Sequence, residues 1–115
     1  MQSTESAQSE FFSECDEILL RFSSKLSKVE KDGCADAESI SALYRDMHTL
    51  KGSAQLFGFR AISQVAHAME AALEPIRRLK LQIPAVLIDA LFKSIDLVDR
   101  IVKESAQSKK EESEK

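Results

Sequence analysis

The feature that most constrains the fold is the spacing of apolar residues, which recur every three or four positions in separate stretches of the chain. This period matches the turn of an α-helix and places the apolar side chains on one face of each helix. With only 3 Gly and 2 Pro in 115 residues, the chain lacks the frequent turn signals of an all-β fold. The apolar faces consist of Phe11, Cys15, Ile18, Leu19, Phe22, Leu26 and Val29; of Ile40, Leu43, Tyr44, Met47, Leu50, Ala54 and Phe57; of Ile62, Val65, Ala66, Met69, Leu73 and Ile76; and of Leu87, Ile88, Leu91, Phe92, Ile95, Val98, Ile101 and Val102.

Turn and capping residues separate these four segments. Gly33 can adopt the positive φ of a turn after the first segment, and Asp36 is a suitable N-cap for the second. Gly58 stands where a glycine commonly closes a helix, so the second segment ends just before it and the third begins near Arg60. Pro84 suits the first turn of the fourth segment. Four amphipathic helices with short links predict an all-α fold, an antiparallel up-down four-helix bundle.

The bundle is expected to span residues 10–104, because polar residues dominate both ends of the chain. Residues 1–9 are expected to form a flexible N-terminus. Residues 105–115 contain no apolar residue after Ala106, so they are expected to form a disordered polar tail or linker. Pro75 lies inside the third segment, where its missing N–H should kink the helix or end it one residue earlier.

Charge and hydropathy exclude several classes of function. The formal net charge is −3, and Lys and Arg are mixed with Asp and Glu, so the chain has no concentrated basic surface for nucleic acid. The chain contains no run of about 18 apolar residues that could cross a membrane. Its first ten residues are polar and do not resemble a secretory signal, so we expect a cytoplasmic protein. In that compartment Cys15, in the core, and Cys34, in a loop, are expected to be reduced thiols.

Both histidines lie on the two middle helices, and their surroundings suggest a polar cluster. A helix advances roughly 100° per residue, which places His48 and Glu70 each at about 100° from the centre of the apolar face of its helix. His48 lies about ten residues before the turn at Gly58 and Glu70 about eleven after it, whereas Lys51 and His67 are each about eight residues from the turn. Antiparallel packing therefore permits one cluster that contains both histidines, Lys51 and Glu70.

Each group in this cluster suits phosphoryl chemistry. A carboxylate that accepts a hydrogen bond from one imidazole nitrogen fixes the tautomer, which leaves the other nitrogen of His48 as a nucleophile. Glu70 would also support the positive charge that develops on the ring, and Lys51 would balance the charge of a phosphoryl group. Gly52 follows His48 by four residues, where a side chain would cover the imidazole, so the glycine is expected to leave access for a large partner.

The sequence around these residues resembles a known family. The stretch HTLKGSAQLFGF at residues 48–59 resembles the HxxKG signature of histidine phosphotransfer (HPt) domains. The stretch VAHAMEAAL at residues 65–73 is similar to the second signature of that family, a histidine followed three residues later by a glutamate. The resemblance covers about residues 11–103, and the chain looks most like the N-terminal phosphoacceptor (P1) domain of CheA-type chemotaxis histidine kinases.

The resemblance implies a role for each of these residues. His48 would accept a phosphoryl group from an ATP-dependent histidine kinase domain and pass it to an aspartate of a response-regulator receiver domain. Glu70 would orient His48, with Lys51 and His67 completing the network. The expected partner-docking residues are Arg45, Gly52, Gln55 and Leu56, of which Leu56 falls nearly opposite the apolar face and should be exposed.

The chain shows no Gly-rich nucleotide loop, so we expect it to bind no cofactor itself; ATP and Mg would be used by the partner kinase domain. The chain alone is then a phosphoacceptor and donor, expected to be monomeric, and the resemblance implies a CheA-type kinase as the parent protein. A fifth helix often follows in CheA-type domains. In this chain the polar tail begins instead, so we expect either a shortened domain or a smaller HPt unit.

Two other functions compete with this interpretation. A bundle can hold a di-iron centre, but such a centre needs ExxH motifs and further inward carboxylates, whereas the motifs here are HxxK and HxxE. The Lys51 ammonium also opposes a cation, so no metal is expected. The second alternative is an HPt-like binding module that docks signalling partners without being phosphorylated.

Overall fold

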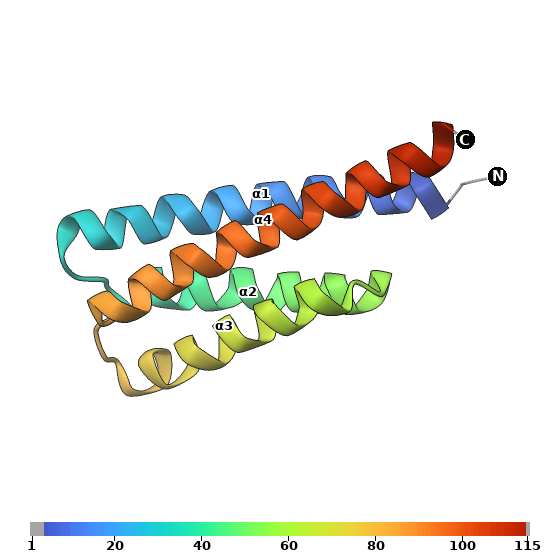
Figure 1. The fold of residues 1–115 in the computed structure, drawn as a ribbon. Coiled ribbons are helices and arrows are strands. Elements are labelled where there is room, and N and C mark those ends of the chain that lie inside the picture. Colours follow the sequence, from blue (N-terminus) through green and yellow to red (C-terminus); the bar gives the residue numbers. More distant parts are fainter. Residues whose placement is uncertain (1–3, 115) are drawn as a thin grey trace.

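The computed structural model describes residues 4–114, which form four α-helices and no strand. The helices are α1 (Thr4–Asp32), α2 (Ala37–Phe57), α3 (Arg60–Leu79) and α4 (Ala85–Glu114). They run alternately up and down, so that the start of α1, the end of α4 and the α2–α3 turn lie at the same end of a bundle measuring 50 × 21 × 18 Å (Figure 1). This arrangement confirms the predicted antiparallel four-helix bundle. Within the described range, none of the helices is long and apolar enough to span a membrane.

Each helix contacts two neighbours. The closest pair is α2 and α3, while α1 packs against α4 and α2, and α3 packs against α4. Among the described residues the backbones of the diagonal pairs, α1 with α3 and α2 with α4, do not approach each other closely. The outer pair α1 and α4 is longer than the α2–α3 hairpin and runs past its turn (Figure 1).

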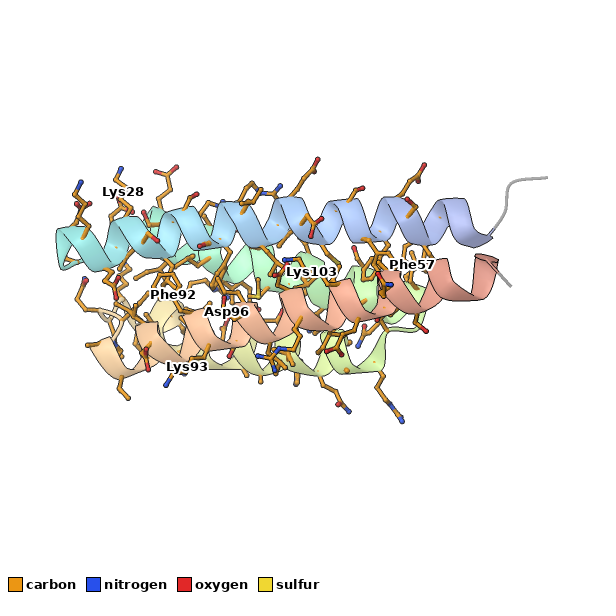
Figure 2. All side chains as sticks on the ribbon, turned by 45° about the horizontal axis from the view of Figure 1, so that its top comes forward. Lys28, Phe57, Phe92, Lys93, Asp96 and Lys103 are labelled. Atoms are coloured by element: carbon orange, nitrogen blue, oxygen red, sulfur yellow. The ribbon has the colours of Figure 1, made fainter. Side chains whose placement is uncertain are left out.

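The predicted apolar faces meet in one core. Every residue assigned to them is buried or packs partly buried against the core. Figure 2 shows Lys28 and Lys93 extending away from the bundle, whereas Phe57 lies among the helices. Burial of each large aliphatic side chain contributes roughly 1.5–3 kcal/mol, which is what holds four otherwise marginal helices together. The largest fully buried side chains are those of Phe11, Phe22, Ile18, Leu26, Leu43, Met47, Leu50, Ile62, Leu73, Leu91, Val98 and Cys15.

The predicted caps are present. Oδ1 of Asp36 accepts a hydrogen bond of 2.7 Å from the backbone N–H of Ser39 and so caps α2. Gly58 adopts a φ of 78° after the last residue of α2, and Gly33 adopts a φ of 77° after α1. Both positions lie in the left-handed region that favours glycine, so these two residues allow the chain to reverse.

Side chains tie the links together at both ends of the bundle. At one end Phe11 of α1 stacks on Phe57 and Phe59, with ring centroids 5.2 and 5.0 Å away. At the other end the side-chain amide of Gln82 accepts a hydrogen bond from the backbone N–H of Ala35 at 2.8 Å and donates to its carbonyl at 3.1 Å. These contacts fix how far each helix is shifted along the bundle axis relative to the others. They therefore also fix which side chains of α2 and α3 lie at the same level.

The two cysteines occupy their predicted places, Cys15 in the core and Cys34 exposed in a loop, and both are free thiols. Burial, with smaller contributions from the carboxylates of Glu14 and Asp16, raises the pKa of the Cys15 thiol to about 12.

The helices are longer than the sequence interpretation expected. α1 begins at Thr4, inside the segment assigned to a flexible N-terminus, and α4 continues to Glu114, through the segment assigned to a disordered tail. The reason is that extending an existing helix avoids the cost of nucleation, and the Ala, Gln, Lys and Glu of these segments are strong helix formers. The flexibility predicted for residues 1–3 lies outside the described residues.

Pro75 does not end α3. The helix continues to Leu79 and closes at Lys80, whose φ of 56° is left-handed. The proline removes the hydrogen-bond donor of the Ala71 carbonyl, but Pro75 and Ala71 are both exposed, so solvent can satisfy that carbonyl. The prediction that the helix ends one residue before the proline is therefore wrong.

Candidate functional site

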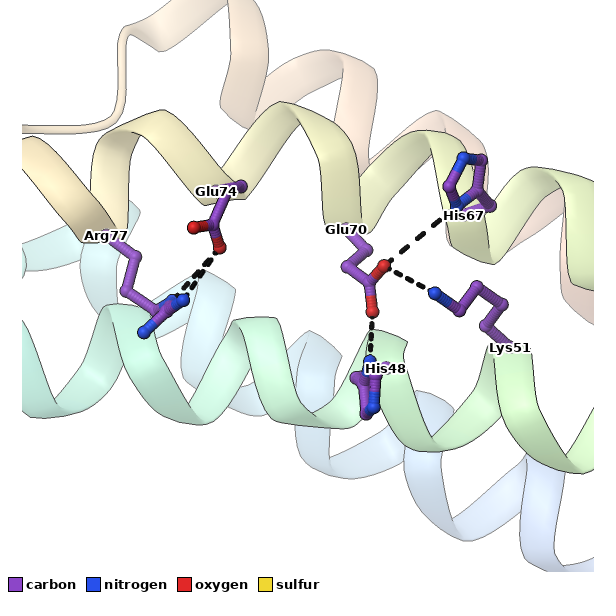
Figure 3. Close-up of polar contacts among 6 residues, drawn as sticks. All are labelled: His48, Lys51, His67, Glu70, Glu74 and Arg77. Atoms are coloured by element: carbon purple, nitrogen blue, oxygen red, sulfur yellow. Dashed lines mark hydrogen bonds and ion pairs between the residues drawn. The ribbon is translucent and has the colours of Figure 1, made fainter.

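The four residues predicted to form a polar cluster meet between α2 and α3 (Figure 3). Glu70 is at the centre. One of its oxygens, Oε2, accepts a hydrogen bond from Nδ1 of His48, and the other, Oε1, lies 2.7 Å from Nζ of Lys51. Nδ1 of His67 lies 3.9 Å from the same Oε1. The positions of these residues relative to the Gly58 turn thus produce the pairing expected from antiparallel packing.

Glu70 carries its charge in a nearly buried position. Only 9% of its side chain is exposed, and this burial raises its pKa. The hydrogen bonds from Lys51 and His48, together with their charges, outweigh burial and hold the pKa of Glu70 below its usual value. The carboxylate is therefore ionised at neutral pH and accepts hydrogen bonds from two sides.

His48 combines a fixed edge with an open edge. Its side chain is 63% exposed although its Nδ1 is bound to Glu70. Because Nδ1 is next to an ionised carboxylate, the proton of a neutral ring lies on Nδ1, and the lone pair lies on Nε2. No group of residues 7–108, whose side chains the structure describes, forms a hydrogen bond with Nε2. The ring thus presents a nucleophilic nitrogen to solvent.

Lys51 and His67 belong to the network to different degrees. The side chain of Lys51 is 20% exposed, and its ammonium forms a charge-assisted hydrogen bond with Glu70. His67 is 67% exposed, and its 3.9 Å separation from Glu70 exceeds a hydrogen bond. Lys51 is therefore a fixed member of the cluster, whereas His67 lies at its edge and interacts with Glu70 through charge when protonated.

The cluster does not fit a metal ion. Glu70 supplies its only carboxylate, and both oxygens of that carboxylate already bind cationic or N–H groups. A divalent cation would have to displace Lys51. Across the part of the chain that the structure describes, no three His, Cys, Asp or Glu side chains are grouped so that they could hold a metal.

The four residues predicted to dock a partner are all exposed on α2: Arg45, Gly52, Gln55 and Leu56. Leu56 is 81% exposed, as predicted. A Cβ added at Gly52 would meet no atom within 4 Å. The prediction that a side chain there would cover the imidazole is therefore wrong for a methyl group, and the glycine faces open space.

The sequence interpretation missed one neighbour of His48, Tyr44, and the residue that contacts Tyr44 in turn, Arg77. It assigned Tyr44 to the apolar face, yet the ring of Tyr44 lies nearly parallel to the imidazole, at 13°, with the ring centroids 6.1 Å apart. It assigned no function to Arg77, whose guanidinium lies 4.4 Å from the centre of the Tyr44 ring and binds Glu74 (Figure 3). The i, i+4 spacing of Tyr44 and His48 was the available signal, because such residues share a helix face.

A second buried carboxylate, also unexpected, lies between α1 and α2. Asp46 is 7% exposed, and its Oδ2 accepts a 2.9 Å hydrogen bond from Nζ of Lys25. Arg21, one turn earlier on α1, lies 3.7 Å from the other oxygen. This group joins the hairpin to α1 on a different side from Glu70.

Known proteins share this sequence and fold. The Hpt domain family model matches residues 7–104. The chemotaxis protein CheA of Rhizobium meliloti is 33% identical over 88 residues, which are 76% of this chain but 12% of that protein. The chain therefore spans about an eighth of the length of such relatives.

Solved structures with the same fold include domains of CheA, in agreement with the sequence matches. The CheA phosphotransferase domain from Thermotoga maritima superposes with a TM-score of 0.82 at 29% identity and covers 92% of this chain and 99% of that chain. The phosphorylated P1 domain of CheA3 in complex with CheY6 from R. sphaeroides has a TM-score of 0.80 over 89% of this chain and 79% of that one; at 20% identity it shows a shared fold alone. The chain thus belongs to the Hpt domain family, the histidine phosphotransfer domains, and within it resembles the P1 domain of CheA.

Proposed function

We propose that this domain is the phosphoryl carrier of a chemotaxis-type two-component pathway, and that His48 is the residue that carries the phosphoryl group. The observation that carries the proposal is the hydrogen bond between the ionised, nearly buried Glu70 and Nδ1 of a histidine whose Nε2 is open to solvent. This arrangement supplies a nucleophile of fixed tautomer on a surface that a folded partner can reach.

In the loading step the lone pair of Nε2 forms a bond to the γ-phosphorus of ATP, which a histidine kinase domain holds together with Mg. The bond from that phosphorus to the bridging oxygen breaks, and ADP leaves with the electron pair. The ring keeps its proton on Nδ1 and becomes positively charged, and the carboxylate of Glu70 balances this charge. Lys51 offsets part of the negative charge of the incoming phosphoryl group.

In the unloading step a carboxylate oxygen of an aspartate on a receiver domain attacks the phosphorus. The bond between phosphorus and Nε2 breaks, its electron pair returns to the ring, and the neutral imidazole with its proton on Nδ1 is restored. Because Glu70 supports the charged ring of the loaded state through a hydrogen bond and its charge, and not through a covalent bond, loading and unloading both remain accessible.

Two partners follow from this cycle. The kinase domain must come from elsewhere, since the sequence contains no Gly-rich nucleotide loop. The receiver domain is supported by the R. sphaeroides relative of the same fold, which is a phosphorylated P1 domain in complex with CheY6. We assign the docking of both to the exposed face around His48 that includes Arg45, Gln55 and Leu56. We place the relay in the cytoplasm, where the ATP consumed by a kinase domain is held.

Intact-mass measurement after incubation with a CheA-type kinase domain and Mg-ATP tests the proposal. The wild type should gain one phosphate that is lost in acid and retained in alkali, as expected of a phosphorus–nitrogen bond. His48→Gln should gain none, and the matched control His67→Gln should still be labelled. Addition of a receiver domain should then remove the phosphate from the wild type.

Two outcomes would contradict the proposal. Continued labelling of His48→Gln would show that another residue is the acceptor. A wild type that binds the kinase and receiver domains without gaining phosphate would favour the alternative of an HPt-like binding module.

A further inference from the structure

We infer that Tyr44 and Arg77 are positioning residues that hold the plane of the His48 ring, a role that rests on the proposed function of His48. The hydrogen bond to Glu70 fixes the position of Nδ1 only. A ring that is 63% exposed and held at a single atom can still swing about its side-chain bonds, which moves Nε2 and its lone pair. Attack on phosphorus needs that lone pair aligned with the bond that forms.

The ring of Tyr44 supplies the missing restraint. Tyr44 lies one turn before His48 on α2, and the two rings are nearly parallel, at 13°. Their centroids are 6.1 Å apart, which is within the range of about 4.5–7 Å for offset-stacked aromatic pairs. A nearly parallel ring at this distance restricts the tilt of the imidazole, whereas the hydrogen bond that Nδ1 donates to Glu70 restricts one edge of the ring.

Arg77 in turn holds Tyr44. Its guanidinium lies 4.4 Å from the centre of the Tyr44 ring, well within the distance of about 6 Å for a cation–π contact. Two hydrogen bonds to Oε2 of Glu74, 3.3 Å from Nε and 2.8 Å from Nη2, set the direction of the guanidinium. Figure 3 shows Arg77 extending from α3 toward α2, on the side of α3 from which Glu70 reaches His48.

Both restraints on His48 therefore depend on residues of α3. Glu70 reaches the ring directly, and Glu74 and Arg77 reach it through Tyr44. This arrangement couples the plane of the imidazole to the packing of the hairpin on which the nucleophile sits.

The test compares Tyr44→Ala with the conservative variant Tyr44→Phe. Under saturating Mg-ATP and with varied amounts of the domain, Tyr44→Ala should lower kcat of phosphorylation about three- to tenfold and leave KM within about twofold, the size expected for loss of one aromatic pair. Tyr44→Phe should restore the wild-type kcat, because the stack needs the ring and not the hydroxyl. Arg77→Met should lower kcat by a smaller factor, about twofold, since it loosens Tyr44 without removing it.

A readout independent of phosphorylation measures the ring itself. In nuclear magnetic resonance spectra of the unphosphorylated domain, contacts between the His48 and Tyr44 ring protons should be present in the wild type. The Nδ1–H tautomer of His48 should persist in Tyr44→Ala, because Glu70 still binds Nδ1, while the rotation of the ring increases. Tyr44→Phe should show the restricted ring of the wild type.

The matched control is Phe12→Ala, which removes another half-buried aromatic residue, one that packs against Phe59 away from His48. It should lower stability as Tyr44→Ala does and leave kcat and the His48 ring unchanged. A wild-type kcat and a wild-type ring in Tyr44→Ala would overturn the inference, and so would a failure of Tyr44→Phe to restore both. If the wild type accepts no phosphate, the proposed function fails, and the ring measurements still decide whether the stack exists.

Discussion

Two buried carboxylates on the same hairpin have similar surroundings and different uses. Asp46, between α1 and α2, and Glu70, between α2 and α3, are each 7% exposed. Each accepts a hydrogen bond from a lysine, at 2.9 Å from Lys25 and at 2.7 Å from Lys51. Each also faces a second basic side chain, which is an arginine at Asp46 and His48 at Glu70.

The difference lies in what the second partner can do. A guanidinium has no lone pair and stays protonated, so the group at Asp46 serves to join two helices. An imidazole that donates one N–H still has a lone pair on the other nitrogen, and at His48 that nitrogen faces solvent. A buried carboxylate therefore supports phosphoryl chemistry only where its partner retains a reactive atom.

The largest expected effect comes from removing the carboxylate of Glu70, which binds His48. Glu70→Ala leaves His48 without its fixed tautomer and without a counter-charge, so phosphorylation by a CheA-type kinase domain should slow about 10- to 100-fold. Rates of phosphate incorporation measured by intact mass check this. The same measurement on Asp46→Ala should give the wild-type rate; equal slowing of both variants would show that buried charge, rather than contact with His48, is what matters.

The converse prediction concerns stability. Asp46→Ala removes the hydrogen bond that Lys25 donates across the α1–α2 interface, so urea denaturation should show a loss of about 1–3 kcal/mol in the free energy of unfolding. Lys25 is one-third exposed and can turn to solvent, which keeps the loss at the lower end of that range. The ion pair between Lys93 and Asp89, both exposed on α4, offers a control: Asp89→Ala should change stability by less than about 0.5 kcal/mol.

The comparison also shows what sequence alone could predict. The helical period identified the core and placed Glu70 at the level of His48, because two residues at similar distance from a tight turn lie at similar positions along an antiparallel hairpin, which permits them to meet. No such rule applied to Asp46. Its partners lie on α1, whose height relative to α2 depends on the link at residues 33–36 and on the packing of Phe11 against Phe57. Those are tertiary contacts that a period does not encode.

The helix ends were missed for a related reason. Hydrophobic periodicity stops where the core stops, whereas a helix continues as long as its residues favour it, as α4 does to Glu114. Tyr44 was missed because an aromatic residue at the edge of an apolar face can serve both the core and a neighbouring ring. The pattern predicted its helix face correctly, and the contact with His48 required the orientation of both side chains.

Comparison with Glu70→Gln isolates the contribution of Glu70 to the acid dependence of stability. Hydrogen bonds hold the pKa of Glu70 in the folded state below its usual value despite burial, so Glu70 contributes stability above its unfolded pKa of about 4.3 and loses that contribution as the pH falls through the folded pKa. Glu70→Gln does not titrate. The stability difference between the two proteins should therefore shift against the wild type as the pH falls below about 5. A pH-independent difference in urea denaturation would contradict this.

The smallest expected effect concerns the open surface at Gly52, one turn after His48 on α2. Gly52 sits inside α2 without a positive φ, and an added Cβ there meets nothing within 4 Å, so Gly52→Ala should raise the free energy of unfolding by about 0.5–1 kcal/mol. Gly33→Ala should lower the free energy of unfolding instead, because Gly33 has a φ of 77° that alanine resists.

The same Gly52→Ala variant tests where the partner docks. If partners approach His48 across Gly52, the stabilised variant should also transfer phosphate more slowly to a receiver domain, while the geometry of the imidazole stays unchanged. A Gly52→Ala variant that is stabilised and transfers at the wild-type rate would show that the receiver domain does not pack closely on the surface at Gly52, and would leave Arg45, Gln55 and Leu56 as the docking contacts around His48.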